Sequence, residues 1–283
     1  MRIKFEKLQA LGNDYIFIDC IRLSLDKIDL SLLSKKICDR NFGVGSDGLI
    51  LIESGKRTRF RMRMFNPDGS EAELCGNGIR CFSRYIFESG LSRKKTQKID
   101  TKKGIIKTEI LSSSFEKFFV KVDMGKPILE AKEIPVKSKN RFFIQEKIKV
   151  GKKKFLATCV AIGNPHVVII VKNFPEDWKE IGSKIEKDKM FPKRTNVEFV
   201  KVKGRKRIEL RVWERGAGVT LASATGGCAA LVACVLSGNT DPFVEVVFEK
   251  GSLKIFWDKD GNHIFVEDPA ERVFSGVFFL RNP

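Results

Sequence analysis

The chain has little of what a membrane span, an exported protein or a metal site would need. In its 283 residues, no apolar run approaches the roughly 18 residues that cross a bilayer, and Met1–Glu6 lacks the apolar stretch of a signal peptide. The seven cysteines form no CxxC pair and are odd in number, so we expect reduced thiols. The two histidines, His166 and His263, belong to no ligand cluster. These absences favour a cytoplasmic protein without a membrane segment or a metal ion.

Acidic residues are few beside the basic ones, 35 against 53, and the net charge is +18. Such an excess raises the question of a nucleic acid or an anionic surface as partner. The basic residues are spread along nearly the whole length, however, and no RNP, zinc-finger or helix-turn-helix signature accompanies them. A solvated basic surface is therefore the preferred interpretation. A basic nucleic-acid-binding module stays as an outside alternative.

The most informative segment is Asn66–Arg80, which reads NPDGSEAELCGNGIR. It places Cys75 in a glycine-rich turn between an alternating strand, Thr58–Asn66, and a helical run, Gly76–Glu88. At a helix start, the macrodipole and the unpaired N–H groups lower a thiol pKa from its usual value of about 8.5. The same N–H groups can hold a carboxylate. The segment thus predicts a thiolate beside an anionic substrate.

A second copy of this pattern lies downstream, where the alternating strand Arg207–Trp213 leads into another turn and the apolar helical run Ala224–Leu236. Aligning Cys75 with Ser223 also aligns Gly78 with Gly226. The segment Ala10–Asn13 is echoed by Ala161–Asn164 at nearly the same offset. Two related half-chains explain both echoes.

The patterns predict an α+β protein with two pseudo-symmetric domains, each a mostly antiparallel or mixed sheet wrapped around a central helix. Glycine and proline interrupt the strand pattern near Met124–Pro127. We therefore expect one domain of residues 1–125 plus 269–283 and a second of residues 126–268. Besides the two runs above, helices are expected over Asp29–Asp39 and Glu176–Lys187. Further strands are expected over Gly48–Glu53, Ile105–Leu111, Phe118–Asp123, Val167–Val171, Phe243–Phe248, Leu253–Trp257 and His263–Glu267.

Two opposed helix starts suit the inversion of an α-carbon, which needs a base on one face and an acid on the other. If the substrate's own carboxylate lies between the two helix starts, it can take up negative charge from the α-carbanion, and the helix starts stabilise that charge. Asn13 and Asn164 occupy matching places in the two halves and are candidates to clamp one small substrate. No phosphate-binding lysine motif or dinucleotide fingerprint competes with this interpretation.

Six blocks of the chain, taken together and in order, resemble the diaminopimelate epimerase family over essentially the whole length. They are Leu11–Tyr15, Gly43–Gly48, Asn66–Arg80, Gly163–His166, Asn196–Phe199 and Glu214–Gly218. The resemblance implies two α/β domains with the active site in the cleft between them. It also implies interconversion of LL- and meso-diaminopimelate without a cofactor, in lysine and peptidoglycan-precursor synthesis. A homodimer is the candidate assembly.

The resemblance also assigns roles to individual residues. It makes Cys75 one catalytic base and places Ser223 at the position of the other, which His166 and Glu214 tune. Substrate-binding positions of the family match Asn13, Asn66, Gly76, Asn77, Asn164, Asn196, Glu214, Arg215, Ala224 and Thr225.

The second turn departs from the family pattern, which has glutamate, cysteine and glycine where this chain has Val219, Ser223 and Ala224. A serine hydroxyl is a far weaker acid than a thiol and needs a strong partner to act as a base near neutral pH. Three interpretations stay open: an epimerase that uses Cys75 and Ser223, a one-base relative that exchanges a proton without inversion, and a relative that binds diaminopimelate without turnover.

Overall fold

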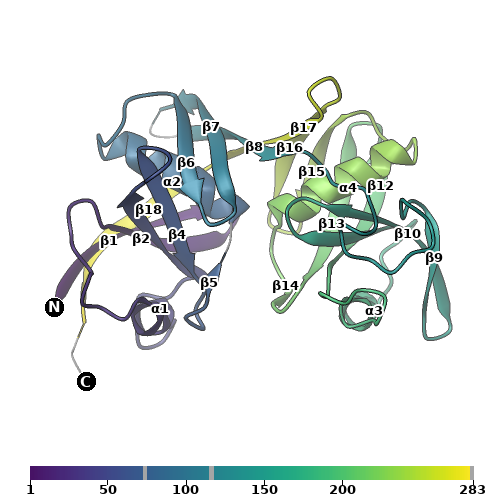
Figure 1. Cartoon of the computed structure of the whole chain (residues 1–283), viewed down its shortest axis with the longest axis horizontal. Helices are drawn as coiled ribbons and strands as arrows, with labels where there is room; N and C mark the ends of the chain where they lie inside the picture. Colours follow the sequence, from purple (N-terminus) through teal and green to yellow (C-terminus); the bar gives the residue numbers. More distant parts are fainter. Residues whose placement is uncertain (73–74, 115–117, 281–283) are drawn as a thin grey trace. The chain divides into compact units, whose positions relative to one another are not determined.

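The computed structural model describes residues 1–72, 75–114 and 118–280. The chain divides into two compact units (Figure 1): unit 1 is Met1–Val122 with Asp268–Pro283, and unit 2 is Asp123–Glu267. In both units strands predominate and two helices pack on the sheet. No helix in these described ranges is long and apolar enough to cross a bilayer.

In unit 1 the edge strand of the sheet is β18, the last strand of the chain, and the other strands follow in sequence order from β1. Antiparallel pairs join β18 to β1 and β1 to β2, and a parallel pair joins β2 to β3. Then β3–β4 is antiparallel, β4–β6 parallel, and β6–β7 and β7–β8 antiparallel, with the short β5 on β4. The bounds are β1 Arg2–Ala10, β2 Asn13–Asp19, α1 Leu30–Cys38, β3 Gly48–Ser54, β4 Phe60–Phe65, β5 Glu71–Ala72, α2 Gly76–Glu88, β6 Thr96–Thr101, β7 Gly104–Ser113, β8 Phe118–Gly125 and β18 Glu271–Phe279.

Unit 2 repeats the same pattern of pairing. Antiparallel pairs join β9 to β10 and β10 to β11, β11–β12 is parallel, and β12–β13 is antiparallel. Then β13–β15 is parallel, β15–β16 and β16–β17 are antiparallel, and the short β14 lies on β13. The bounds are β9 Glu146–Val150, β10 Lys153–Ala161, β11 Pro165–Ile170, α3 Trp178–Glu186, β12 Asn196–Gly204, β13 Arg207–Glu214, β14 Gly218–Val219, α4 Ala224–Leu236, β15 Phe243–Phe248, β16 Gly251–Asp258 and β17 His263–Pro269.

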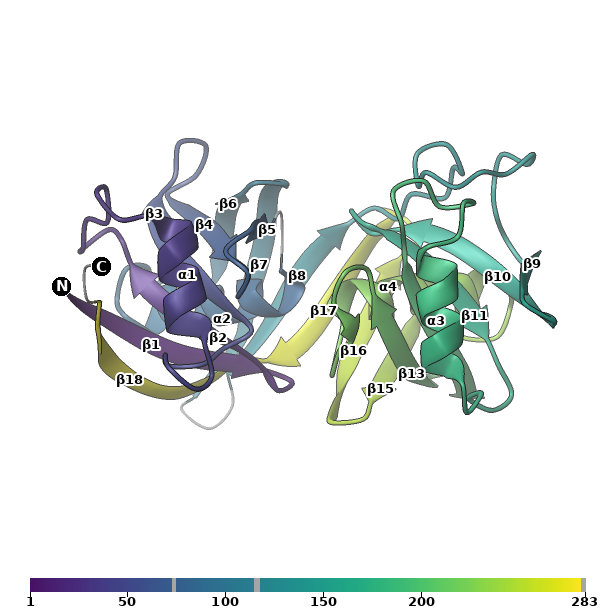
Figure 2. The ribbon, with the colours of Figure 1, turned by 90° about the horizontal axis from the view of Figure 1, so that it is seen from below.

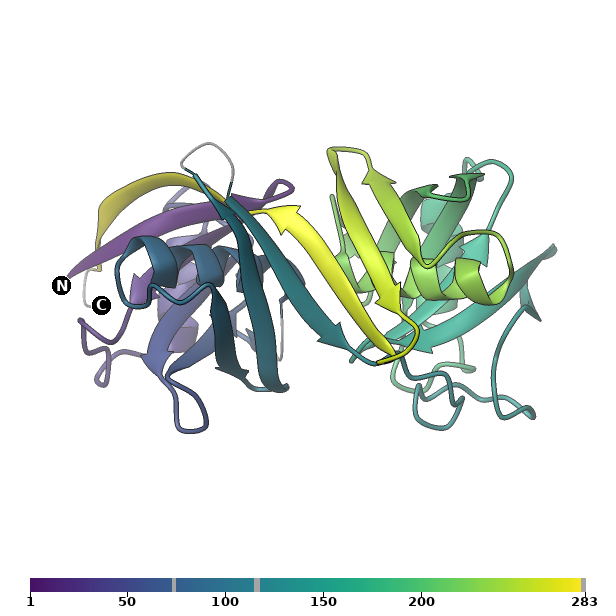
Figure 3. The ribbon, with the colours of Figure 1, turned by 90° about the horizontal axis from the view of Figure 1, so that it is seen from above.

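One helix of each unit lies inside the curve of its sheet. In unit 2, α4 packs against β10, β11, β12, β13, β15 and β16, and its residues from Gly226 to Cys234 are buried. An all-round apolar helix needs such an enclosure. In unit 1, α2 packs against β1, β2, β7 and β18 (Figure 3). It is less apolar, and its buried arginines are paired with acids.

The other helix of each unit covers the opposite face of the sheet (Figure 2). In unit 2, Trp178 and Ile181 of α3 join Val197 and Phe199 of β12 in one buried cluster. In unit 1, Leu33 and Ile37 of α1 pack with residues of β2 and β3. Because strand residues alternate between faces, Glu198, which lies between Val197 and Phe199, faces the inner helix.

The structure confirms all four expected helices, two of them over the same residues as predicted. Expected strands agree to within a few residues. The sequence patterns predicted no strand at β1, β2, β5, β6, β9, β10, β12, β14 or β18.

Candidate active site

Cys75 is the N-cap residue of α2. Its extended backbone turns the side chain back over the helix start, where the Gly78 N–H donates to Cys75 Sγ at 3.2 Å. The hydroxyl of Tyr15 lies 3.1 Å from the same sulfur. The thiol is half-buried and belongs to no disulfide in the described structure. A sulfur so placed can give or take a proton at the helix end.

The expected lowering of the Cys75 pKa is wrong. Burial raises the pKa of this thiol above its usual value, and the hydrogen bonds with Tyr15 and with the backbone of Gly78 and Asn77 offset only part of the increase. The sequence pattern identified the helix start but not the amount of protein packed around the sulfur. The thiolate is therefore scarcer, and more basic, than the helix start alone implies.

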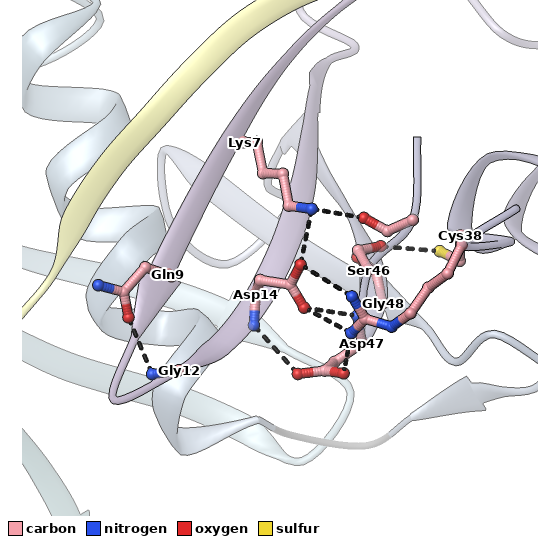
Figure 4. A network of polar contacts seen from close by, with 10 residues as sticks. Lys7, Gln9, Gly12, Asp14, Cys38, Ser46, Asp47 and Gly48 are labelled. Atoms are coloured by element: carbon pink, nitrogen blue, oxygen red, sulfur yellow. Dashed lines mark hydrogen bonds and ion pairs between the residues drawn. The ribbon is translucent and has the colours of Figure 1, made fainter. Parts of the chain in front are cut away.

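A network of charged groups holds the beginning of β2, which carries Asn13 and Tyr15 (Figure 4). The Asp14 carboxylate accepts from Lys7 Nζ at 2.7 Å and from Arg40 Nη2 at 2.9 Å. Burial raises the pKa of Asp14, but the bonds from Lys7 and Arg40 outweigh it and leave the pKa below its usual value. The Asp14 N–H donates to the Asp47 carboxylate at 3.1 Å, and the Asp47 N–H donates to the Asp14 carbonyl at 2.9 Å, which fixes the start of β2 against the start of β3.

The other predicted residues of unit 1 are Asn66, in the turn after β4, and Gly76 and Asn77, at the start of α2. The carbonyl of Asn66 accepts from Ser34 Oγ at 2.8 Å, and its amide Nδ2 donates to Ser70 Oγ at 2.9 Å. Gly76 and Asn77 open α2, and both accept hydrogen bonds from the guanidinium of Arg80. Arg80 is fully buried and forms an ion pair of 3.1 Å with Asp268. This pair anchors the helix start that presents Cys75.

Ser223 occupies the same position in unit 2. It is the N-cap residue of α4, with φ and ψ of −136° and 114° against −131° and 111° at Cys75. The Gly226 N–H donates to Ser223 Oγ at 3.2 Å. Ala224 and Thr225 follow as the first helical residues, and Ala224 is buried. The sequence alignment of Cys75 with Ser223 thus matches the two backbones.

His166 of unit 2 is fully buried between two polar partners. Its Nδ1 lies 2.7 Å from Glu198 Oε1, and its Nε2 lies 2.8 Å from Asn164 Oδ1. Glu198 is also fully buried. On the aligned strands, the unit 1 residue that matches His166 is Tyr15, since Tyr15 pairs with Gly48 and His166 with Asn196.

Asn196 links the other predicted residues of unit 2. Its Nδ2 donates to the Pro165 carbonyl at 3.2 Å, and its Oδ1 accepts from the Arg215 N–H at 2.8 Å. Glu214 accepts from Thr220 Oγ1 at 2.9 Å. These contacts tie the Asn164–His166 loop and the turn after β13 to one buried amide.

Two residues at these sites were not among the predicted ones. Tyr15 contacts the sulfur of Cys75, and Glu198 contacts His166. A signal for Glu198 was present, since an acid interrupts the apolar run Val197–Val200 of β12. Within the described ranges, no cluster of three or more His, Cys, Asp or Glu side chains is suited to hold a metal.

Comparison with known proteins gives a consistent family. The diaminopimelate epimerase family model matches residues 5–130 and 158–273. Diaminopimelate epimerase of Acetivibrio thermocellus is 46% identical over 277 residues, covering 97% of this chain and 98% of the relative. The enzyme of that name from Methanococcus maripaludis is 44% identical over 275 residues, covering 97% and 99%.

Solved structures agree on the fold at low identity. A phenazine biosynthesis protein of the PhzF family from Bacillus anthracis has a TM-score of 0.68 at 17% identity, covering 99% of this chain and all of that one (100%). A probable proline racemase from Agrobacterium radiobacter has a TM-score of 0.71 at 10% identity, covering 97% and 92%. With a family model over most of its length and relatives this similar end to end, the chain belongs to the diaminopimelate epimerase family.

Proposed function

We propose that this protein epimerises LL-diaminopimelate to meso-diaminopimelate without a cofactor. The diaminopimelate epimerase of Acetivibrio thermocellus matches 97% of the chain at 46% identity. The observation that carries the proposal is the position of Cys75, whose sulfur caps α2 within 3.1 Å of the Tyr15 hydroxyl. The relationship gives no support to a nucleic-acid partner, for which charge is the only argument.

We further propose that residues 1–125 plus 269–283 and residues 126–268 act as two domains that bind one substrate between them. Support comes from the repeated strand pairing and from the matching N-caps, Cys75 and Ser223. Each helix start offers backbone N–H groups to a carboxylate. Asn13, Asn66, Gly76 and Asn77 would bind from one side; Asn164, Asn196, Glu214, Arg215, Ala224 and Thr225 would bind from the other.

In this mechanism Cys75 acts on one face of the carbon, where its thiolate removes the α-proton or its thiol returns one. The electron pair stays on the substrate, where the helix N-termini stabilise the spread charge. The residue at the Ser223 position gives or takes the proton on the opposite face. Inversion results because removal and return take place on different faces.

A one-base relative is the second candidate, and Ser223 is the observation that favours it. A hydroxyl without a strong partner does not ionise near neutral pH. Such a protein would exchange the α-proton through Cys75 and leave the configuration unchanged. A protein that binds diaminopimelate without turnover would do neither.

To test the proposal, purified protein is incubated with LL-diaminopimelate and the products are separated by chiral chromatography. Formation of the meso isomer, and its loss in the variant Cys75→Ala, are expected. Absence of the meso isomer with retained α-proton exchange would establish the one-base candidate instead. Binding measured by calorimetry without either reaction would leave only a binding protein.

A homodimer is proposed through the edge of unit 1. Among the described strands β18 pairs only with β1, and Val273, Phe274, Val277 and Phe279 are 43% to 61% exposed. An exposed apolar edge strand favours pairing with a second copy. Light scattering of the unmodified protein should give a molar mass twice that of one chain, and the variant Phe279→Lys should give a lower mass. A monomeric unmodified protein would contradict the proposal.

A further inference from the structure

A buried acid without an assigned role lies beneath the start of α4. Glu198 of β12 is fully buried and faces the inner helix of unit 2. Its Oε1 lies 2.7 Å from His166 Nδ1, whereas its Oε2 is buried and has no hydrogen-bond partner within the described structure. A buried carboxyl oxygen without a partner is costly, so its retention calls for an explanation.

Glu198 and Ser223 both lie beside Gly226 in the first turn of α4. A Cβ atom at Gly226 would lie 2.9 Å from Glu198 Oε1 and 3.1 Å from Ser223 Oγ, so the two oxygens flank the same side of this glycine. The two oxygens therefore lie no more than 6.0 Å apart, a separation that one water molecule can bridge.

The matching place in unit 1 is apolar. A Cβ atom at Gly78 would lie 2.7 Å from Ile50 Cδ1 and 3.3 Å from Cys75 Sγ. The helix that presents a thiol thus rests on an isoleucine, and the helix that presents a hydroxyl rests on an acid. A thiol ionises without an adjacent base, whereas a serine hydroxyl needs one.

The environment of Glu198 suits proton exchange. His166 connects the carboxyl to a neighbouring amide, since its Nδ1 lies 2.7 Å from Glu198 Oε1 and its Nε2 lies 2.8 Å from Asn164 Oδ1. The charged and titratable groups around the carboxyl are His166 on β11, Glu214 on β13, Ser223 at α4 and the thiol of Cys159 on β10. Burial raises the pKa of Glu198, the contact with His166 lowers it and Glu214 raises it, with a net increase.

We propose that Glu198 exchanges a proton with the hydroxyl of Ser223 during the epimerisation proposed above, on which this inference rests. When the α-carbon loses its proton on this face, the C–H bond breaks and its electrons stay on carbon. The proton joins Ser223 Oγ while the original hydroxyl proton passes to one bridging water molecule, which gives a proton to Glu198. In the return direction each transfer is reversed. His166 holds the carboxyl in place.

Four proteins test this in heavy water with LL- and meso-diaminopimelate: unmodified, Glu198→Gln, Ser223→Ala and the double variant. Glu198→Gln should slow inversion by about 100-fold or more, the usual effect of removing an acid–base group. Exchange at the α-carbon configuration that Cys75 serves, and KM, should stay within a few-fold. The double variant should be no slower than Ser223→Ala, because the two groups act as one unit.

Glu209→Gln is the matched control, since Glu209 lies on β13 of the same sheet and pairs with the exposed Lys203. It should leave inversion unchanged. If Glu198→Gln does not fold, Glu198→Asp replaces it, because aspartate keeps the charge but places the carboxyl farther from Ser223. The same result is then expected, a loss of inversion with retained exchange.

Two results would overturn the inference while leaving the proposed function intact. One is inversion by Glu198→Gln or Glu198→Asp at the unmodified rate. The other is an equal loss of exchange at both configurations, which indicates a structural role. No exchange by the unmodified protein with either isomer would refute the proposed function itself, and this inference with it.

Discussion

The Tyr15 hydroxyl lies 3.1 Å from Cys75 Sγ. A charged network holds the strand that carries Tyr15, and a buried ion pair holds the helix start that carries Cys75. Asp14, beside Tyr15, is bound by Lys7 and Arg40. Arg80, five residues after Cys75, is bound by Asp268. The contact with the sulfur is therefore set by rigid supports on both sides.

Tyr15→Phe should raise the pKa of Cys75, because the hydrogen bond between Tyr15 and this thiol lowers it. At any pH below that pKa, the thiolate fraction falls, so alkylation by iodoacetamide slows and its pH profile moves to higher pH. The chain has two tyrosines, and Tyr85→Phe is the control, expected to leave the profile unchanged. An unchanged profile in Tyr15→Phe would show that the contact does not affect ionisation.

Ser223→Cys should increase the rate of inversion by about 10-fold or more, because a thiol ionises far more readily than a hydroxyl. The steady-state rate with LL-diaminopimelate measures it. Ser237→Cys, at the other end of α4, is the control and should not alter the rate. A slower Ser223→Cys would mean that the hydroxyl is already the better matched group.

Gly226→Ala should lower the inversion rate about 10-fold or more, because the added Cβ would lie 2.9 Å from Glu198 Oε1 and 3.1 Å from Ser223 Oγ. Elsewhere in a helix this change stabilises by about 0.5–1 kcal/mol. Gly204→Ala, where nothing lies within 4 Å, should not change the rate. Unaltered kinetics in Gly226→Ala would show that the packing there is not needed.

Arg80→Met should lower the free energy of unfolding by about 3–5 kcal/mol, since it leaves the Asp268 carboxyl buried without its partner. Chemical denaturation measures it, with the exposed Lys184→Met of α3 as a control expected to change little.

The loss in Arg80→Met should also depend on pH. Burial raises the pKa of Asp268 and Arg80 lowers it, and the net result is a pKa of about 7, so removing Arg80 raises the pKa further. A carboxyl whose folded pKa lies above its unfolded value stabilises at low pH and loses that contribution as pH rises. Arg80→Met should therefore be more destabilised at pH about 8 than at about 5; the reverse order would contradict the assignment.

Much of the fold could be predicted because its signals are local. The glycine-rich turns before Gly76 and Ala224 and the apolar periodicity after them predicted α2 and α4 over their observed bounds. The edge strand β18 could not be predicted in this way, because its exposed apolar residues break the alternation that marks a half-buried strand.

Among the candidate site residues, Cys75 stands out by residue type in its glycine-rich turn, whereas Asn196 follows only from the family resemblance. The ionisation of Cys75 could not be predicted, because desolvation depends on packing from β2 and the rest of unit 1. The role inferred for Glu198 depends on two strands and a helix that meet only in the folded unit.

The most direct measurement follows the α-proton of pure LL-diaminopimelate by NMR in heavy water while chiral chromatography follows the configuration. Deuterium should enter at the α-carbon and the meso isomer should accumulate, with both reactions lost in Cys75→Ala. Deuterium entry that continues in Cys75→Ala, or no entry at all in the unmodified protein, would contradict a mechanism centred on this thiol.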